Sequence, residues 1–182
     1  MPSAVEAGPV AAVRGRLLRF GLIVAAAVLV AAQISKWVIL EKVMQPPRVI
    51  EVTSFFNLRM AWNTGVSFGM FGDGGDVGRW VLTVFPLAIT AFLLNWLRQA
   101  ERRILALALG LVIGGAIGNV IDRVRFGAVA DFLDFHLFGW HFWTFNVADS
   151  AISIGVALLL YDSVFGPDSG KAPPGGTGGE NQ

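Results

Sequence analysis

Four aspartates lie within one stretch of this chain, residues 114–150, together with two asparagines. They are Asp122, Asp131, Asp134 and Asp149. Most of the sequence around them is apolar, and carboxyl groups at the edge of a membrane protein are costly enough to mark functional sites by default. These four side chains are therefore the first candidates for chemistry.

Two predicted helix ends each present an asparagine and an aspartate, and Asp131 lies between them in the sequence. Asn119 and Asp122 lie three residues apart at the end of one apolar run, and Asn146 and Asp149 open the next run with the same spacing. Two carboxyl groups brought together cannot both ionise cheaply, so they share a proton. One can then activate water while the other protonates a carbonyl oxygen, which is the chemistry of an aspartic protease.

Structural roles for the same residues stay open at this point. Asn146 and Asp149 also fit a helix N-cap followed by an acid in the first turn, where the helix dipole favours negative charge. The acid and arginine that end the third apolar run could be interfacial anchors. Asp131 and Asp134 would face opposite sides in a strand but the same side in a helix.

The composition places the chain among membrane proteins. Of its 182 residues 54% are hydrophobic and only 15% are charged, where a soluble domain has about 25%. The net charge of +1 gives no reason to expect nucleic acid as a partner. The chain has no cysteine, which excludes disulfides, thiol catalysis and cysteine-based metal sites.

Four apolar runs, at about residues 20–40, 80–97, 104–121 and 147–165, approach the roughly 20 residues that a helix needs to cross a bilayer. They predict a membrane all-α protein, a bundle of four transmembrane helices. Residues 1–16 and 166–182 are expected to be disordered tails around one membrane-embedded domain, residues 17–165. A cleaved signal peptide is the alternative for the first run, and Lys36 near its end is expected to snorkel toward the headgroups.

The segments between the spans indicate which side of the membrane each faces. Residues 49–71 are rich in Val, Thr, Phe and Trp, which predicts two short strands joined around Asn57, or an extended loop. Arginines cluster before the first span and after the second, so both termini are expected to be cytoplasmic and residues 41–79 and 122–146 to face outward. These arginines are Arg14, Arg16, Arg19, Arg98, Arg102 and Arg103.

Three glycines recur every fourth residue in the third span, at Gly110, Gly114 and Gly118. Such spacing gives a helix one smooth face that a neighbour can approach closely. The neighbour could be another helix of the bundle, an acyl chain or the helix of a bound signal peptide.

Four blocks resemble those of the lipoprotein signal peptidase family, also called signal peptidase II or prolipoprotein signal peptidase. They are residues 63–68 (NTGVSF), 114–123 (GGAIGNVIDR), 129–135 (VADFLDF) and 145–150 (FNVADS). The blocks follow the order and spacing of that family, and the resemblance covers roughly residues 17–165.

The resemblance implies a four-helix aspartyl endopeptidase of the bacterial cytoplasmic (inner) membrane, with a small extracytoplasmic β-sheet. It would cut the signal peptide of a prolipoprotein just before the diacylglyceryl-modified cysteine. The implied partners are this substrate and membrane lipids, with no metal or other cofactor, and a monomer is expected. By motif, Asp131 and Asp149 would be catalytic, Asp122 would be a structural polar residue, and the substrate-binding residues would be Asn63, Gly65, Asn119, Arg123 and Asn146.

Other hydrolase patterns fit the sequence less well. Residues 65–69 read GVSFG and match the nucleophile-elbow pattern, but that pattern needs a strand before the turn and a helix after it. Ser35 and Lys36 could suggest a serine–lysine pair, although adjacent residues of a helix point apart. His136 and His141 lack a ligand set for zinc and are expected in an interfacial aromatic belt.

A small multi-pass transporter or membrane assembly factor is the alternative outside the enzymes. In it Asp131 and Asp149 would carry a proton or a cation. A transport path needs polar groups through the bilayer, whereas here they gather at one face.

Overall fold

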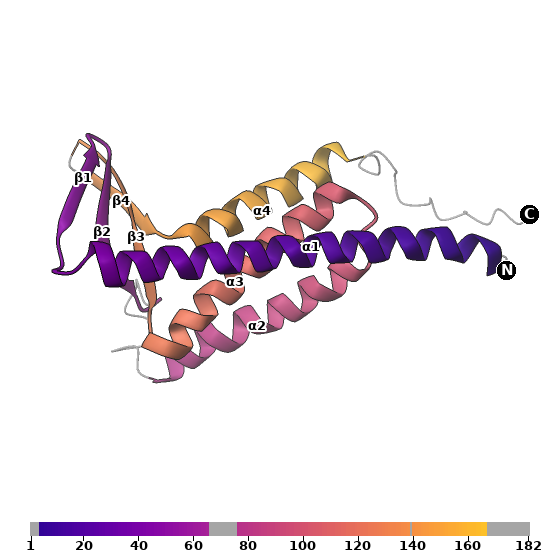
Figure 1. Ribbon diagram of the computed structural model, residues 1–182, viewed down its shortest axis with the longest axis horizontal. Coiled ribbons are helices and arrows are strands. Elements are labelled where there is room, and N and C mark those ends of the chain that lie inside the picture. Colours follow the sequence, from indigo (N-terminus) through magenta and orange to yellow (C-terminus); the bar gives the residue numbers. More distant parts are fainter. Residues whose placement is uncertain (1–3, 66–75, 139, 167–182) are drawn as a thin grey trace, which may run out of the picture.

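The computed structural model describes residues 4–65, 76–138 and 140–166. This part of the chain forms four helices and a four-stranded sheet at one end of the helix bundle (Figure 1). The helices are α1 (Ala4–Val38), α2 (Asp76–Arg98), α3 (Arg103–Phe126) and α4 (Val147–Phe165), and α1 continues into a π-helical turn, η1 (Ile39–Val43). The strands are β1 (Val49–Thr53), β2 (Phe56–Asn63), β3 (Val129–Leu137) and β4 (Trp140–Phe145).

Each helix is long and apolar enough to cross a membrane. The candidate spans are Val10–Val43, Gly78–Arg98, Arg103–Phe126 and Val147–Phe165. Large apolar side chains such as Ile23 and Phe85 are exposed on the helix surfaces, as a lipid environment allows. The prediction of a four-helix membrane bundle with a small sheet is confirmed.

Helix α1 begins earlier than the sequence predicts. Residues 4–16, for which a disordered tail is expected, are helical in the structure. The segment is rich in alanine, a strong helix former, and extending an existing helix costs much less than starting one. An ion pair between Arg14 and Glu101 ties the extension to the α2–α3 connection. The other expected tail, from residue 167 onward, lies outside the described residues.

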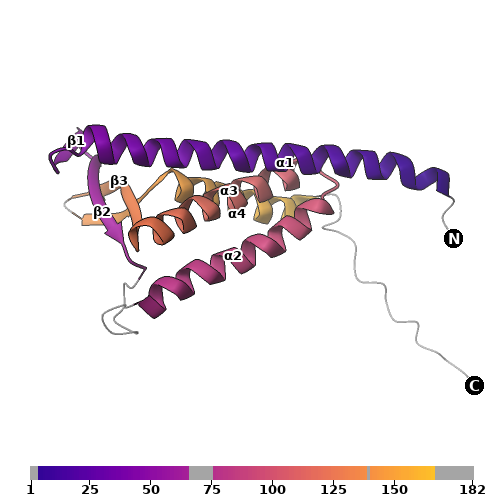
Figure 2. The ribbon, with the colours of Figure 1, turned by 60° about the horizontal axis from the view of Figure 1, so that its bottom comes forward.

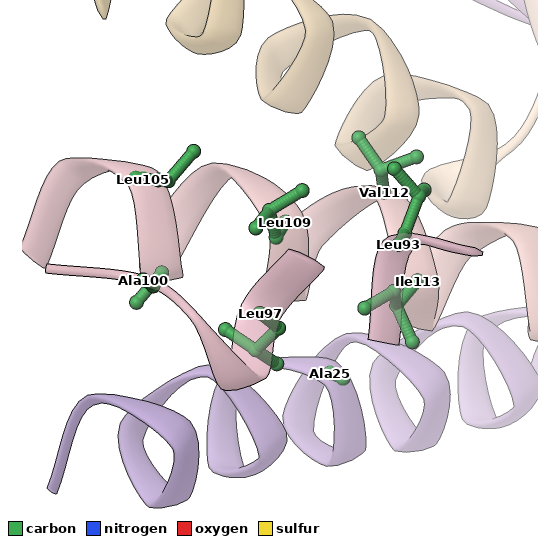
Figure 3. Packing of buried hydrophobic residues seen from close by; sticks show 9 residues of the cluster. Ala25, Leu93, Leu97, Ala100, Leu105, Leu109, Val112 and Ile113 are labelled. Atoms are coloured by element: carbon green, nitrogen blue, oxygen red, sulfur yellow. The ribbon is translucent and has the colours of Figure 1, made fainter. Parts of the chain in front are cut away.

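Helix α3 forms the centre of the bundle. Its most apolar window is 67% buried, against 17–22% for the other three spans, and it contacts all three of the other helices. Figure 2 shows α1 and α2 on opposite sides of it. Figure 3 shows the largest core cluster, in which Ala25 of α1 and Leu93 and Leu97 of α2 meet Leu109 and Ile113 of α3.

The glycines of α3 are where the neighbouring helices come closest. A Cβ atom at Gly114 would lie 2.5 Å from the carbonyl oxygen of Ala25, and one at Gly110 would lie 2.5 Å from that of Gly21. On another side of the helix, Gly115 faces the carbonyl oxygen of Ala148 at the same distance. Helix packing is therefore the role seen for Gly110 and Gly114. Because α1 is part of this packing, its apolar run belongs to the bundle.

The sheet is antiparallel, with strand order β1-β2-β3-β4. The strands predicted in residues 49–71 are present as β1 and β2, but their turn comes before Phe56, and Asn57 lies inside β2 opposite Asp134. Gly127 ends α3 with a φ of 79°, which a glycine adopts without strain and which turns the chain into β3. Asn146 follows the last residue of β4 and caps α4. These two junctions carry Asp131 and Asp149 toward each other.

Replacing Gly114 by alanine is expected to destabilise the bundle by about 1–3 kcal/mol, because the added methyl forces α1 and α3 apart. Gly118→Ala is the matched control, since a Cβ there would meet Ala148 and Ala32 at 3.5 Å, an ordinary contact. Thermal unfolding in detergent measures both. Equal unfolding temperatures for the two variants would contradict the packing argument.

Candidate active site

Asp131 lies near the start of β3 and is only 2% exposed. Its Oδ1 accepts a hydrogen bond from Nδ2 of Asn146 at 2.7 Å, and its Oδ2 accepts one from Nδ2 of Asn63 at 3.0 Å. Both donors are neutral amides. They satisfy the carboxyl oxygens without supplying a compensating charge.

Asp149 lies in the first turn of α4. Its Oδ1 accepts a hydrogen bond from Nδ2 of Asn119 at 2.7 Å, and its Oδ2 accepts one from the backbone nitrogen of Asn146 at 3.1 Å. In return, Oδ1 of Asn146 accepts from the backbone nitrogens of Ala148 and Asp149, which completes a capping box. Asp149 therefore has the capping role that its sequence position allows, and it also faces Asn119 of α3.

The three asparagines are held so that their N–H groups point at the acids. Oδ1 of Asn63 accepts from the backbone nitrogen of Gly65 at 2.8 Å, and Oδ1 of Asn119 accepts from Nζ of Lys36 at 2.9 Å. Oδ1 of Asn146 is held by the capping bonds. Turning any of these amides over would place its oxygen against a carboxyl oxygen, so each has one favourable orientation.

Lys36 is buried, with 3% exposed, and forms an ion pair with Asp122 at 2.7 Å. The expectation that it snorkels is wrong, because Asp122 offers a buried partner and breaking such a pair is strongly destabilising. Asp122 also accepts from the backbone nitrogen of Ala130 at 3.1 Å and from Nε2 of Gln33 at 3.3 Å. The pair therefore joins α1, α3 and β3 directly behind the site.

Sequence reasoning missed Gln33 and Lys36 as parts of this network. Both lie in an otherwise apolar run and are three residues apart, so they share one face of α1. A polar pair inside a membrane span is a functional candidate by default. Applied to α1, the argument that singles out the aspartates would have found them.

Burial raises the pKa of Asp131 to about 6, from an ordinary value of 3.8. The hydrogen bonds from Asn146 and Asn63 oppose this rise, while the nearby charge of Asp149 adds to it. A carboxyl group with this pKa takes up a proton much nearer neutral pH than an exposed aspartate does.

Arg123 lies near the end of α3, and its positive charge interacts with the carboxylates of Asp149, Asp131 and Asp122. Its backbone oxygen accepts a hydrogen bond from Nε of Arg79 at 2.9 Å, which joins the start of α2 to the end of α3. The structure thus brings Arg123 and Asp122, the acid that is predicted to have a structural role, to the end of the bundle that holds Asp131 and Asp149.

An open pocket of about 310 Å³ reaches Asp131. Gly65 forms part of its rim with a φ of 80°, and a Cβ atom there would collide with Leu82 of α2. Glycine at this position therefore follows from both backbone and space. The lining comes from the end of β2, the turn after it, β3 and β4: Ala61, Trp62, Asn63, Thr64, Gly65, Asp131, Trp143 and Thr144.

Asp134 does not join the acid pair. It lies on β3 three residues after Asp131, and successive side chains of a strand alternate between its two faces. Asp134 therefore points to the opposite face, where Nδ1 of His141 lies 2.8 Å from its Oδ2. The sequence left open whether Asp131 and Asp134 face the same side or opposite sides, and the strand places them on opposite sides.

The serine–lysine pair is not formed. Oγ of Ser35 donates to the backbone oxygen of Ala32 in its own helix at 2.8 Å, while Lys36 reaches Asp122. The nucleophile-elbow pattern runs past Gly65 into residues 66–69, which lie outside the described residues.

A bundle of four membrane-spanning helices, with two hydrogen-bonded carboxyl groups and an open pocket at one end, defines a multi-pass membrane protein with an enzyme-like site. The sequence profile of the family described as signal peptidase (SPase) II matches residues 24–165. The chain belongs to this family and is therefore a membrane peptidase.

Relatives and solved structures agree with this assignment. A lipoprotein signal peptidase of Rhizorhabdus wittichii is 50% identical over 147 residues, which cover 80% of this chain and 84% of that protein. One of Rhodopseudomonas palustris (strain TIE-1) is 40% identical over 163 residues, covering 86% and 98%. A bacterial membrane enzyme solved at 1.9 Å resolution superposes with a TM-score of 0.70 at 28% identity, covering 80% and 92%. A second, at 2.3 Å resolution, gives 0.69 at 27% identity, covering 85% and 93%.

The raised pKa of Asp131 predicts how stability depends on pH. Between about pH 4 and 6 the folded protein keeps a proton that the unfolded chain has lost, so this group's contribution is complete at low pH and disappears as the pH rises through about 6. Asp131→Asn removes the titration. The variant is expected to gain roughly 2 kcal/mol of stability relative to the unmodified protein between pH 4.5 and 7.5.

Thermal unfolding in detergent at the two pH values measures this difference. Glu51→Gln, the same change at an exposed carboxyl group of β1, is the control and should follow the unmodified protein. If the Asp131→Asn curve runs parallel to the unmodified one, Asp131 does not titrate in this range.

Proposed function

We propose that the protein is an aspartic endopeptidase that removes signal peptides from lipid-modified prolipoproteins, cutting just before the diacylglyceryl cysteine. The observation that carries this proposal is the acid pair itself. Asn146 donates to Asp131 through its side chain and to Asp149 through its backbone, beside an open pocket. The relatives named lipoprotein signal peptidase support the substrate class.

In the proposed reaction the two carboxyl groups share the proton transfers. Asp149, as the carboxylate, takes a proton from water, and the hydroxide oxygen bonds to the scissile carbonyl carbon. Asp131, as the acid, gives its proton to the carbonyl oxygen. When the carbon–nitrogen bond breaks, the leaving nitrogen takes the proton held by Asp149, and the hydroxyl formed on carbon returns its proton to Asp131.

The surroundings of the two acids support this division of roles. A pKa of about 6 lets Asp131 hold a proton close to neutral pH, and Asp131 is the acid that lines the pocket. Asp149 lies in the first turn of α4, at the end of the helix where the dipole favours a nearby negative charge. Water and the two acids balance the reaction, so it requires no cofactor.

The transporter alternative has less support. At the sheet end the buried Lys36, Asp122 and Asp131 lie together, and at the opposite end Asp162 pairs with Arg102 at 2.8 Å. Between these ends the described part of the bundle holds an apolar core cluster. A path for ions would need polar groups along that length.

Asp131→Asn and Asp149→Asn are each expected to lower cleavage at least about a hundredfold, the usual contribution of a catalytic acid or base. Asparagine keeps the shape but can neither hold the shared proton nor act as the base. Release of the signal peptide from a purified prolipoprotein in detergent measures the effect.

Ser35→Ala, beside the site but outside the pair, should keep its activity. A purely structural Asp149 predicts a different outcome, in which Asp149→Asn loses roughly 1 kcal/mol of stability from a weaker helix start while turnover persists. Full activity in either aspartate variant would rule out the pair.

Recognition of the lipid is expected because of the depth of the site. Asp149 opens the span α4, and Asp131 lies in the strand that follows α3, so both belong near the headgroup region. Burying the substrate's acyl chains contributes about 0.8 kcal/mol per CH₂ and would hold the scissile bond at that depth.

The same prolipoprotein offered with and without its diacylglyceryl group tests this. Only the lipidated form is expected to be cut at an appreciable rate. Equal cleavage of the two forms would defeat lipid recognition, and cleavage of neither would favour the transporter.

The orientation that we infer puts both termini in the cytoplasm of a bacterial inner membrane and the site on the outer face. Helix α1 begins and α4 ends at the end of the bundle opposite the sheet (Figure 1), where the arginine clusters also lie. Because the chain has no cysteine, single cysteines report location without a background. A membrane-impermeant thiol reagent should label Glu51→Cys but not Gln99→Cys in intact cells, and the reverse pattern would invert the topology.

A further inference from the structure

A second buried carboxyl group lies on the face of β3 opposite the site. Asp134 is 0% exposed, and Nδ1 of His141 lies 3.0 and 2.8 Å from its two oxygens. Oγ1 of Thr144 donates to it at 3.4 Å, and the guanidinium of Arg59 approaches both of its oxygens at 3.5 Å. Nη2 of Arg59 also reaches Oγ1 of Thr144 at 3.4 Å. We call these four residues the Asp134 cluster.

The cluster joins three strands around one carboxylate. Arg59 comes from β2, Asp134 from β3, and His141 and Thr144 from β4. Thr144 lies directly opposite Asp134 in the β3–β4 pairing. Removing one partner of a buried carboxylate is strongly destabilising, because the charge stays buried without compensation.

Strand β4 has few other contacts that hold it in the sheet. It is one of the two edge strands, so its backbone pairs with β3 on one side only. Its register with β3 shifts between Phe135 and His136, which interrupts the pairing. Three of its aromatic side chains are exposed and give it little buried surface: Trp140, Phe142 and Trp143.

The same strand forms one side of the pocket. Trp143 and Thr144 line it together with Asp131 and the end of β2. The chain then continues into Asn146, but this residue is fixed independently by its capping bonds and by its bond to Asp131. A loosened β4 would therefore move the pocket side while the acid pair keeps its geometry.

We propose that Asp134 and His141 are positioning residues that clamp β4 as a side of the substrate pocket, and so set substrate affinity without taking part in the chemistry. This inference rests on the proposed peptidase function of the adjacent pocket. It assigns Asp134 a role distinct from that of Asp131, although both belong to the same strand.

Two substitutions at His141 test the clamp. His141→Leu removes the donor to Asp134, and KM is expected to rise about tenfold, the size of one hydrogen bond to a charged group, with kcat within a factor of about two because uniform binding alone is lost. His141→Gln keeps a donor and should restore most of the affinity. His136→Gln is the matched control, since its ring lies 5.3 Å from that of His141 without a bond to Asp134.

The clamp is supported if KM rises in His141→Leu but stays close to the unmodified value in His141→Gln. If His141→Leu leaves KM unchanged, or lowers kcat as much as kcat/KM, the inference is overturned. Asp134→Asn gives a second test at the other partner, and its KM should rise as well. Should that variant fail to fold, the His141 pair still decides.

Hydrogen exchange on the intact protein in detergent, without substrate, separates this inference from the proposed function. In His141→Leu the amides of β4 should exchange faster than in the unmodified protein, while those of α4 stay unchanged. If β4 shows no change, the clamp is refuted whatever the protein cleaves. Faster exchange in a protein that cuts no prolipoprotein would uphold the clamp and refute the proposed function.

Discussion

The carboxamide of Asn146 is the group on which the rest of the site depends. Its oxygen caps α4, its nitrogen donates to Asp131, and the backbone nitrogen of the same residue donates to Asp149. One residue therefore fixes the start of a membrane-spanning helix and its relation to the neighbouring strand. An amide can do this because it carries a donor and an acceptor on one rigid plane. A hydroxyl group could cap the helix, but it could not span the same distance with both functions.

Behind this amide, the ion pair of Lys36 and Asp122 gives the site a second constraint. Both charges are buried, and such a pair contributes little net stability although removing one partner costs much. Its value here is geometric. Lys36 also holds the oxygen of Asn119, so that the amide nitrogen faces Asp149. The longest helix of the bundle thus orients an amide on α3 that in turn contacts the acid on α4.

The two faces of β3 place their aspartates in different surroundings. Asp131 faces the helix ends and its neutral amide donors, where burial moves its pKa toward neutrality. Asp134 faces the guanidinium of Arg59 and Nδ1 of His141. The same residue type therefore has two chemical environments three positions apart. Strand alternation is what separates them, since a helix would have placed both acids on one side.

The sequence by itself determined the four spans, because hydropathy and length are properties of contiguous residues, and the blocks that carry the family resemblance singled out Asp131 and Asp149. Only the tertiary structure decided that Lys36 is buried, since its partner Asn119 lies 83 residues away along the chain. It likewise decided that Asn57 lies inside a strand, opposite Asp134. Local patterns report which residues can enter a membrane or a strand. They do not report which polar groups come into contact there. In a low-dielectric interior these contacts determine where each charged side chain can lie.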